Sequence, residues 1–142
     1  MSYEFLTHSA AETIDAGTEI AKKLGHRNVI CLFGDLGAGK TTLIKGIQAY
    51  FAPNTAEKNP ANSPTFVYLN IYEGQIPIYH FDLYRLRDAD EFLGMGFDEY
   101  LFMEGVCCIE WSERITALIP SDCVRITLTH SGGDTRRIFV SC

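Results

Sequence analysis

The sequence lacks any apolar run approaching the roughly 18 residues that a membrane-spanning helix requires. Its opening stretch, MSYEFLTHSAAET, has neither the basic start nor the apolar core of a secretory signal. Its five cysteines are an odd number and include no CxxC pair, which argues against a disulfide framework and against a zinc site. We therefore expect a cytoplasmic protein with reduced thiols and no contact with a membrane.

Basic residues are also scarce, and they are not clustered. Lys and Arg together number 12 against 18 Asp and Glu, which gives a formal net charge of −6. Proteins that grip nucleic acid by themselves neutralise its phosphates with clustered Lys and Arg. The composition therefore disfavours autonomous binding to RNA or DNA, and it leaves open an acidic surface for a protein partner.

The pattern along the chain predicts an α/β fold in a single domain spanning residues 1–142. Ser9 and Glu12 form a capping-box pattern where the first helix should begin. Helices are predicted over 10–24, 40–51 and parts of 88–102, strands over 28–33, 65–72, 76–84, 105–111, 124–130 and 135–141, and an exposed loop over 52–64. The sheet should be mixed and mostly parallel, flanked by helices, with an antiparallel hairpin at its C-terminal end.

Residues 34–41, GDLGAGKT, match the phosphate-loop pattern G-x-x-x-x-G-K-[ST] at every specified position, between a predicted strand and a predicted helix. Such a loop curls so that successive N–H groups point at phosphate oxygens, and side chains at several positions would block that approach. The following helix adds the positive end of its dipole. Lys40 should reach the β- and γ-phosphates and the Thr41 hydroxyl should ligate magnesium, which predicts a P-loop NTPase fold. The alternative is a glycine-rich turn without a ligand, which the strand–loop–helix setting disfavours.

Hydrolysis would also need a carboxylate near the metal, commonly at the C-terminal end of a neighbouring buried strand. Glu110 and Asp82 each follow an apolar run and are the two candidates, although a carboxylate in that place is often only a helix cap or a salt-bridge partner. Thr65, in NSPTF, is a candidate switch threonine that senses the γ-phosphate, or else simply the start of a strand after Pro64.

Four further residues have both a structural and a functional interpretation. His80 is interpreted as a hydrogen-bonded histidine of the sheet rather than as a base. Trp111 is either part of the core or an exposed contact for a partner. Arg85 and Arg87 are most simply solvated, with neutralisation of phosphate charge as the alternative.

With the phosphate loop, SPTF, HFDLYRL and IEW in this order and spacing, the sequence resembles the TsaE family (formerly YjeE) from about Ser9 to about Val140. The resemblance implies a bacterial ATPase that uses ATP and Mg²⁺ and is required for threonylcarbamoyl modification of the adenosine beside the tRNA anticodon. It also implies that the protein acts with TsaD and TsaB, resetting the synthase assembly between turnovers, and meets tRNA only through that complex. The chain departs from the family at Asn70, where many members carry Glu, and in a longer segment over 52–62.

The same resemblance implies site roles. The phosphates would be held by Gly37, Ala38, Gly39, Lys40, Thr41 and Thr42. Magnesium would be ligated by Thr41 and by Glu110, directly or through water, while Asp82 would orient water or the metal at the γ-phosphate. Ser63 and Thr65 would belong to a nucleotide-sensing segment, and Trp111 to the margin of the site.

Two other functions stay open at this stage. A small-molecule kinase would use the same phosphate loop, but it would need an acceptor pocket and an arginine-bearing lid, for which the chain has no spare segment. A nucleotide-gated binding module with negligible turnover would use the same residues. GTP is disfavoured because no N-K-x-D motif occurs, whereas adenine specificity has no local signature.

Overall fold

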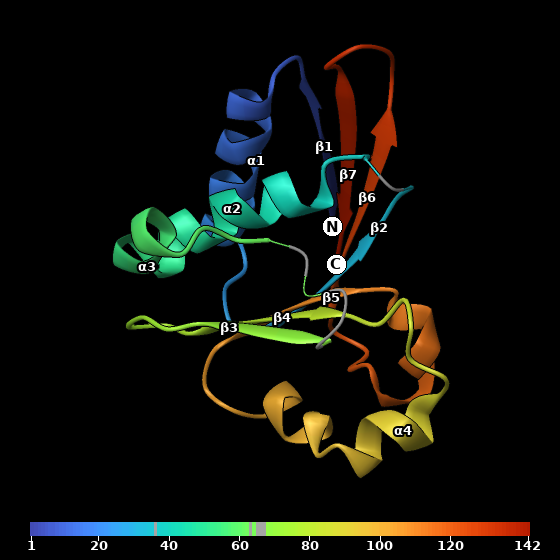
Figure 1. Cartoon of the computed structure of the whole chain (residues 1–142). Coiled ribbons are helices and arrows are strands. Elements are labelled where there is room, and N and C mark those ends of the chain that lie inside the picture. Colours follow the sequence, from blue (N-terminus) through green and yellow to red (C-terminus); the bar gives the residue numbers. More distant parts are fainter. Residues whose placement is uncertain (36, 63, 65–67) are drawn as a thin grey trace.

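The computed structural model describes residues 1–35, 37–62, 64 and 68–142, and within them one seven-stranded sheet has helices on both faces (Figure 1). The strands are β1 (Ser2–Thr7), β2 (Val29–Phe33), β3 (Leu69–Tyr72), β4 (Ile78–Asp82), β5 (Val106–Glu110), β6 (Val124–His130) and β7 (Arg136–Ser141). The helices are α1 (Ala10–Lys22), α2 (Lys40–Phe51), α3 (Pro53–Lys58) and α4 (Ala89–Gly94), with the 3₁₀-helices η1 (Phe97–Leu101) and η2 (Ser112–Leu118).

The sheet runs in the order β1-β7-β6-β2-β5-β4-β3, and its four central strands are parallel. The edge strands pair antiparallel, β7 with both β6 and β1 on one side and β3 with β4 on the other. Strands β4 and β5 are buried along their whole length, as expected for the middle of a sheet covered on both faces. This confirms the predicted fold class, including the antiparallel hairpin formed by β6 and β7.

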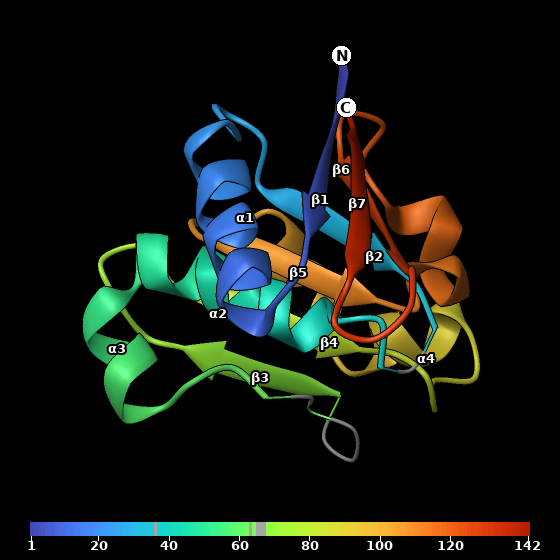
Figure 2. The same cartoon turned by 90° about the horizontal axis from the view of Figure 1, so that it is seen from above.

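Helices α1 and α2 cover one face of the sheet, and α4 lies on the opposite side (Figures 1 and 2). The two helices cross closely because glycines meet at the contact. A Cβ on Gly46 would lie 1.9 Å from the Ile14 carbonyl oxygen, and one on Gly17 would lie 2.2 Å from the Leu43 carbonyl oxygen. The Thr18 hydroxyl donates to the Gly46 carbonyl across the same contact, at 3.0 Å. Helix α2, which begins at the phosphate loop, is therefore fixed directly against α1.

The start of α1 follows the prediction. Ser9 caps α1 by accepting from the Glu12 amide at 3.1 Å, as the capping-box pattern indicated. Four of the five thiols are buried, those of Cys31, Cys107, Cys108 and Cys123, and none of the five forms a disulfide.

Three elements differ from the sequence-based prediction. The loop expected over 52–64 contains α3, because Pro53 occupies the first turn, where its fixed φ and missing N–H suit a helix. Strand β1 was not predicted; it pairs along one edge with β7, and its exposure alternates, so it has no continuous apolar run. The 3₁₀-helix η2 was not predicted either. No helix among the described residues is long and apolar enough to cross a membrane.

Candidate active site

The glycine-rich loop connects the C-terminal end of β2 to the first residue of α2, Lys40. Its glycines are needed where the backbone is left-handed or crowded. Gly39 has φ 104° and precedes the helix directly, a conformation that a residue with a Cβ rarely adopts. A Cβ on Gly34 would approach the Leu128 carbonyl oxygen to 2.7 Å. At Gly34 and Gly39 the backbone therefore favours the glycines that the phosphate-loop pattern specifies.

A cavity of about 770 Å³ opens above this loop, a volume within the range of small-molecule sites. The residues lining it come from the loop, from α2, from the ends of β4 and β5 and from the start of β7. They are Gly34, Asp35, Gly37, Gly39, Lys40, Thr41, Thr42, Asp82, Tyr84, Arg85, Glu110, Trp111 and Arg136.

The two predicted carboxylates lie together on the wall of this cavity. Asp82 ends β4 and Glu110 ends β5, and the parallel register places these two residues directly opposite each other. Both are buried, with 7% and 4% of their surface exposed. Asp82 accepts a hydrogen bond from the Tyr84 amide at 3.1 Å. The structure thus brings both candidates beside the phosphate loop, as their positions at strand ends predicted.

Lys40 links the loop to Glu110. Its Nζ donates to the Gly34 carbonyl at 2.7 Å and lies 3.7 Å from Glu110 Oε1, and only 10% of its side chain is exposed. The Trp111 ring lies 5.7 Å from the same nitrogen. The carbonyl and the carboxylate both stabilise this buried ammonium, which lies at the start of α2 and lines the cavity.

Trp111 lines the cavity, at the site margin where the family resemblance placed it, and it also packs against the hydrophobic core. Its backbone has φ 63°, an uncommon conformation for a residue with a side chain, and its ring packs against Tyr84 with the centroids 5.0 Å apart. Such strain persists only where surrounding contacts impose it, and it is frequent at functional sites.

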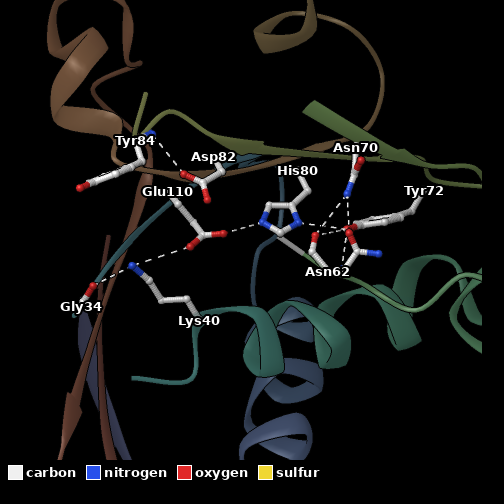
Figure 3. Close-up of polar contacts among 9 residues, drawn as sticks. All are labelled: Gly34, Lys40, Asn62, Asn70, Tyr72, His80, Asp82, Tyr84 and Glu110. Carbon is white, nitrogen blue, oxygen red and sulfur yellow. Dashed lines mark hydrogen bonds and ion pairs between the residues drawn. The ribbon is translucent and has the colours of Figure 1, made fainter. Parts of the chain in front are cut away.

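His80 has both ring nitrogens hydrogen-bonded and no exposed surface, as predicted for a histidine of the sheet. The sequence did not predict that Glu110 is one of its partners. Nε2 lies 2.7 Å from Glu110 Oε2, and Nδ1 lies 3.0 Å from the Tyr72 hydroxyl (Figure 3). The imidazole therefore lies directly behind a predicted site carboxylate.

The two arginines, for which the sequence left both a solvated position and a place near the phosphates open, lie in different surroundings. Arg85 lines the cavity, whereas Arg87 forms an exposed ion pair with Asp88 at 3.3 Å. Arg136, which the sequence did not single out, donates to the Gly37 carbonyl at 3.3 Å and to the carbonyls of Gly133 and Thr135 at 2.9 and 3.1 Å. No spacing rule could have identified Arg136, because it reaches the phosphate loop only through the pairing of β7 into the sheet.

The described residues include no group of three or more His, Cys, Asp and Glu side chains that would hold a metal by themselves. The side-chain oxygens on the cavity wall include those of Asp82, Glu110 and Thr41, and Asp35 and Thr42 line it as well. Proteins usually bind Mg²⁺ through one or two carboxylates, while substrate phosphates and water complete the coordination. These residues therefore fit that ion. The predicted roles of Ser63 and Thr65 fall outside the described residues.

Comparison with known proteins agrees with this geometry. Residues 7–138 match the sequence profile of the family described as threonylcarbamoyl adenosine biosynthesis protein TsaE. A TsaE protein from Treponema pallidum is 35% identical over 136 residues, which cover 96% of this chain and 98% of the relative. One from Bacillus subtilis is 42% identical over 112 residues, which cover 78% of this chain and 67% of the relative. The crystal structure of Bacillus subtilis YdiB superposes with a TM-score of 0.74 at 31% identity, over 99% of this chain and 84% of that one.

Proposed function

This chain belongs to the TsaE family of tRNA threonylcarbamoyladenosine biosynthesis proteins, and on that premise we propose that it is the Mg²⁺-dependent ATPase of that machinery. One observation carries the proposal. A single cavity has a phosphate loop on one wall and two buried strand-end carboxylates, Asp82 and Glu110, on the other. Nucleotide hydrolysis requires both parts: groups that position the phosphates, and opposite them groups that hold the metal and the attacking water.

Each part of the cavity has a role in this proposal. The loop amides and the N-terminus of α2 bind the phosphates of ATP, and Lys40 places its ammonium at the β- and γ-phosphates. Thr41 and Glu110 hold the metal, and Asp82 orients the attacking water. Bound Mg²⁺ supplies neutralisation of the charge that develops on the phosphates. Arg136 holds the loop in shape through the Gly37 carbonyl.

Turnover is proposed to depend on partners. We assign homologues of TsaD and TsaB as the partner proteins, with tRNA met only through their complex. Hydrolysis by the chain alone is then slow, and it rises when the assembly forms. In this proposal the chain uses ATP hydrolysis to reset the complex between turnovers, and it does not itself make the threonylcarbamoyl group.

The experiment is ATP hydrolysis by the purified chain, alone and with purified TsaD and TsaB homologues. Lys40→Ala should abolish turnover, because the Lys40 ammonium is the charge assigned to the β- and γ-phosphates. Lys45→Ala is the matched control, since Lys45 lies on the same helix but is exposed, and it should leave turnover unchanged. Normal hydrolysis by Lys40→Ala would overturn the phosphate-loop assignment.

A second variant separates an ATPase from a nucleotide-gated binding module. Glu110→Ala should lower Mg²⁺-dependent hydrolysis more than it lowers nucleotide affinity measured by calorimetry, because Glu110 serves the metal rather than the phosphates. Glu104→Ala, at an exposed position before β5, is its control. Equal losses of turnover and affinity would make Glu110 a structural residue. Tight binding of ATP without turnover, even with both partners present, would favour the binding module.

A further inference from the structure

Behind Glu110, a row of buried polar groups crosses the face of the sheet that α2 covers (Figure 3). Glu110 contacts His80 at 2.7 Å, His80 contacts Tyr72 at 3.0 Å, and the Tyr72 hydroxyl accepts from the Asn62 amide at 3.1 Å. Asn62 is held in turn by the Asn70 side-chain amide, at 2.9 Å from its Oδ1. The row joins β5, β4 and β3 to the residue that directly precedes the SPTF motif.

The hydrogen-bond inventory gives the contact between His80 and Glu110 a direction. The Glu110 carboxylate only accepts, so the hydrogen of the 2.7 Å contact belongs to His80 Nε2. In a neutral imidazole Nδ1 then has no hydrogen and accepts, and the Tyr72 hydroxyl lies against it at 3.0 Å. The same hydroxyl has a second acceptor, the Asn62 carbonyl at 3.0 Å, and its oxygen accepts from the Asn62 amide. The one Tyr72 hydrogen therefore serves two acceptors, and the donation from His80 to Glu110 is the step of the row whose direction is fixed.

Burial keeps water from replacing the hydrogen-bond partners in this row. His80 has no exposed surface and Tyr72 has 1%, so water does not replace either partner. Burial also raises the pKa of the Tyr72 phenol, so the hydroxyl keeps its hydrogen. A buried polar group that loses its partner costs more free energy than the bond itself contributes, so the row holds one geometry strongly.

We propose that His80 is a positioning residue for the nucleotide site, which fixes the Glu110 carboxylate through Nε2–H, while the Tyr72 hydroxyl holds the ring from its other nitrogen. The inference rests on the proposed ATPase function for its kinetic consequence only. Glu110 is held on one oxygen by His80 and lies 3.7 Å from Lys40 Nζ through the other, so its rotation is limited from both sides. Residues that orient a metal-binding or catalytic carboxylate in this way typically change activity about 10- to 100-fold when they are lost.

Two substitutions of His80 by amide side chains distinguish a positioning role from a purely space-filling role. A glutamine side chain reaches as far as the Nε2 of histidine, so His80→Gln keeps an N–H donor for Glu110. An asparagine reaches only as far as Nδ1, so His80→Asn keeps a polar group beside Tyr72 but loses the donor. The two variants bury the same functional group and differ by one methylene.

The kinetic test is kcat and KM for ATP in the presence of the partner proteins, with thermal melting as the control for folding. We expect His80→Asn to lower kcat about 10- to 100-fold with KM changed less than about twofold, and His80→Gln to keep most of kcat. Tyr72→Phe should lower kcat a few-fold. Equal losses in the two amide variants, or a change in KM alone, would overturn the positioning role, and an unchanged rate in Tyr72→Phe would overturn the part assigned to Tyr72.

A second measurement needs neither nucleotide nor catalysis. Imidazole ¹⁵N spectra of the native protein report which ring nitrogen of His80 carries the hydrogen. Loss of one signal set in each of His8→Gln, His26→Gln and His130→Gln, all at exposed positions, assigns the remaining set of the four histidines to His80. We expect the Nε2–H tautomer. The Nδ1–H tautomer would overturn the proposal. Since this result is independent of turnover, it distinguishes failure of the positioning row from failure of the proposed ATPase function, and it stands if the kinetic variants do not fold.

Discussion

At the residue scale, the cavity depends on side chains brought in from distant parts of the chain. Arg136 lies 99 positions after Gly37, yet its guanidinium donates to the carbonyls of Gly37, Gly133 and Thr135. A planar guanidinium can hold several carbonyls at once, which a lysine ammonium on a flexible stem does poorly. Arg136 therefore ties the C-terminal hairpin to the phosphate loop.

This tie predicts how Arg136 variants behave. Arg136→Ala should weaken ATP affinity several-fold, because the loop loses a constraint on its phosphate-binding shape. Arg136→Lys should recover only part of the loss, since the charge remains but the fork of hydrogen bonds does not. Titration calorimetry measures both, with Arg137→Ala as the control, because Arg137 points instead to Glu4 at 2.7 Å. Equal affinities in Arg136→Ala and wild type would contradict this role.

The thiols give a second prediction at this scale. Burial raises the pKa of Cys31 and of Cys107 to about 12 and raises that of Cys108 well above its usual value, so these thiols stay protonated and unreactive at neutral pH. Cys142 is the one exposed cysteine. Titration with a thiol reagent should therefore count one fast-reacting group in the native protein and all five in denaturant. Fast reaction of several thiols in the native state would show that the core opens readily.

At the scale of elements, the crossing of α1 and α2 depends on two glycines. Gly46→Ala would place a methyl group 1.9 Å from the Ile14 carbonyl oxygen, so the helices must separate. Overpacking of this kind costs about 1–3 kcal/mol or more of unfolding free energy. We expect a clear fall in the urea midpoint, and a weaker affinity for ATP because α2 begins at the phosphate loop.

A matched glycine makes this prediction specific. Gly94→Ala, near the end of α4, meets no heavy atom within 4 Å, so its effect on stability should be small. If both variants unfold at the same denaturant concentration, close helix contact at Gly46 does not limit stability.

The sequence predicted elements well where a local pattern decides the structure. The continuous apolar runs ending in Glu110 and Asp82 indicated buried parallel strands, and the strand-end rule then placed both carboxylates at one edge of the sheet. Strand β1 was missed because an edge strand alternates in exposure and depends on its pairing with β7. The roles of His80 and Arg136 were missed for the same reason, since their partners lie 30 and 99 residues away.

At the scale of the whole molecule, the negative charge is concentrated. Residues 88–104, which include α4 and η1, contain six Asp and Glu and no Lys or Arg. That surplus equals the net charge of −6, so the rest of the chain has equal numbers of acidic and basic residues. An acidic region and a remainder without surplus positive charge disfavour autonomous binding to a phosphate backbone.

The chain alone should therefore not bind tRNA at physiological salt. A filter-binding or gel-shift titration of tRNA should show no saturable complex with the isolated chain, and retention of tRNA only when the TsaD and TsaB homologues are added. A tight, salt-sensitive complex with the isolated chain would contradict both the charge argument and the indirect role assigned to tRNA.

The placement of Trp111 has one more consequence. It is the only tryptophan in the sequence, and its ring lines the cavity 5.7 Å from Lys40 Nζ and in contact with Tyr84. Indole emission is sensitive to nearby charge and to stacking, so the intrinsic fluorescence of the protein comes mainly from this one site. Each ligand that enters the cavity is thus reported optically by the unlabelled protein.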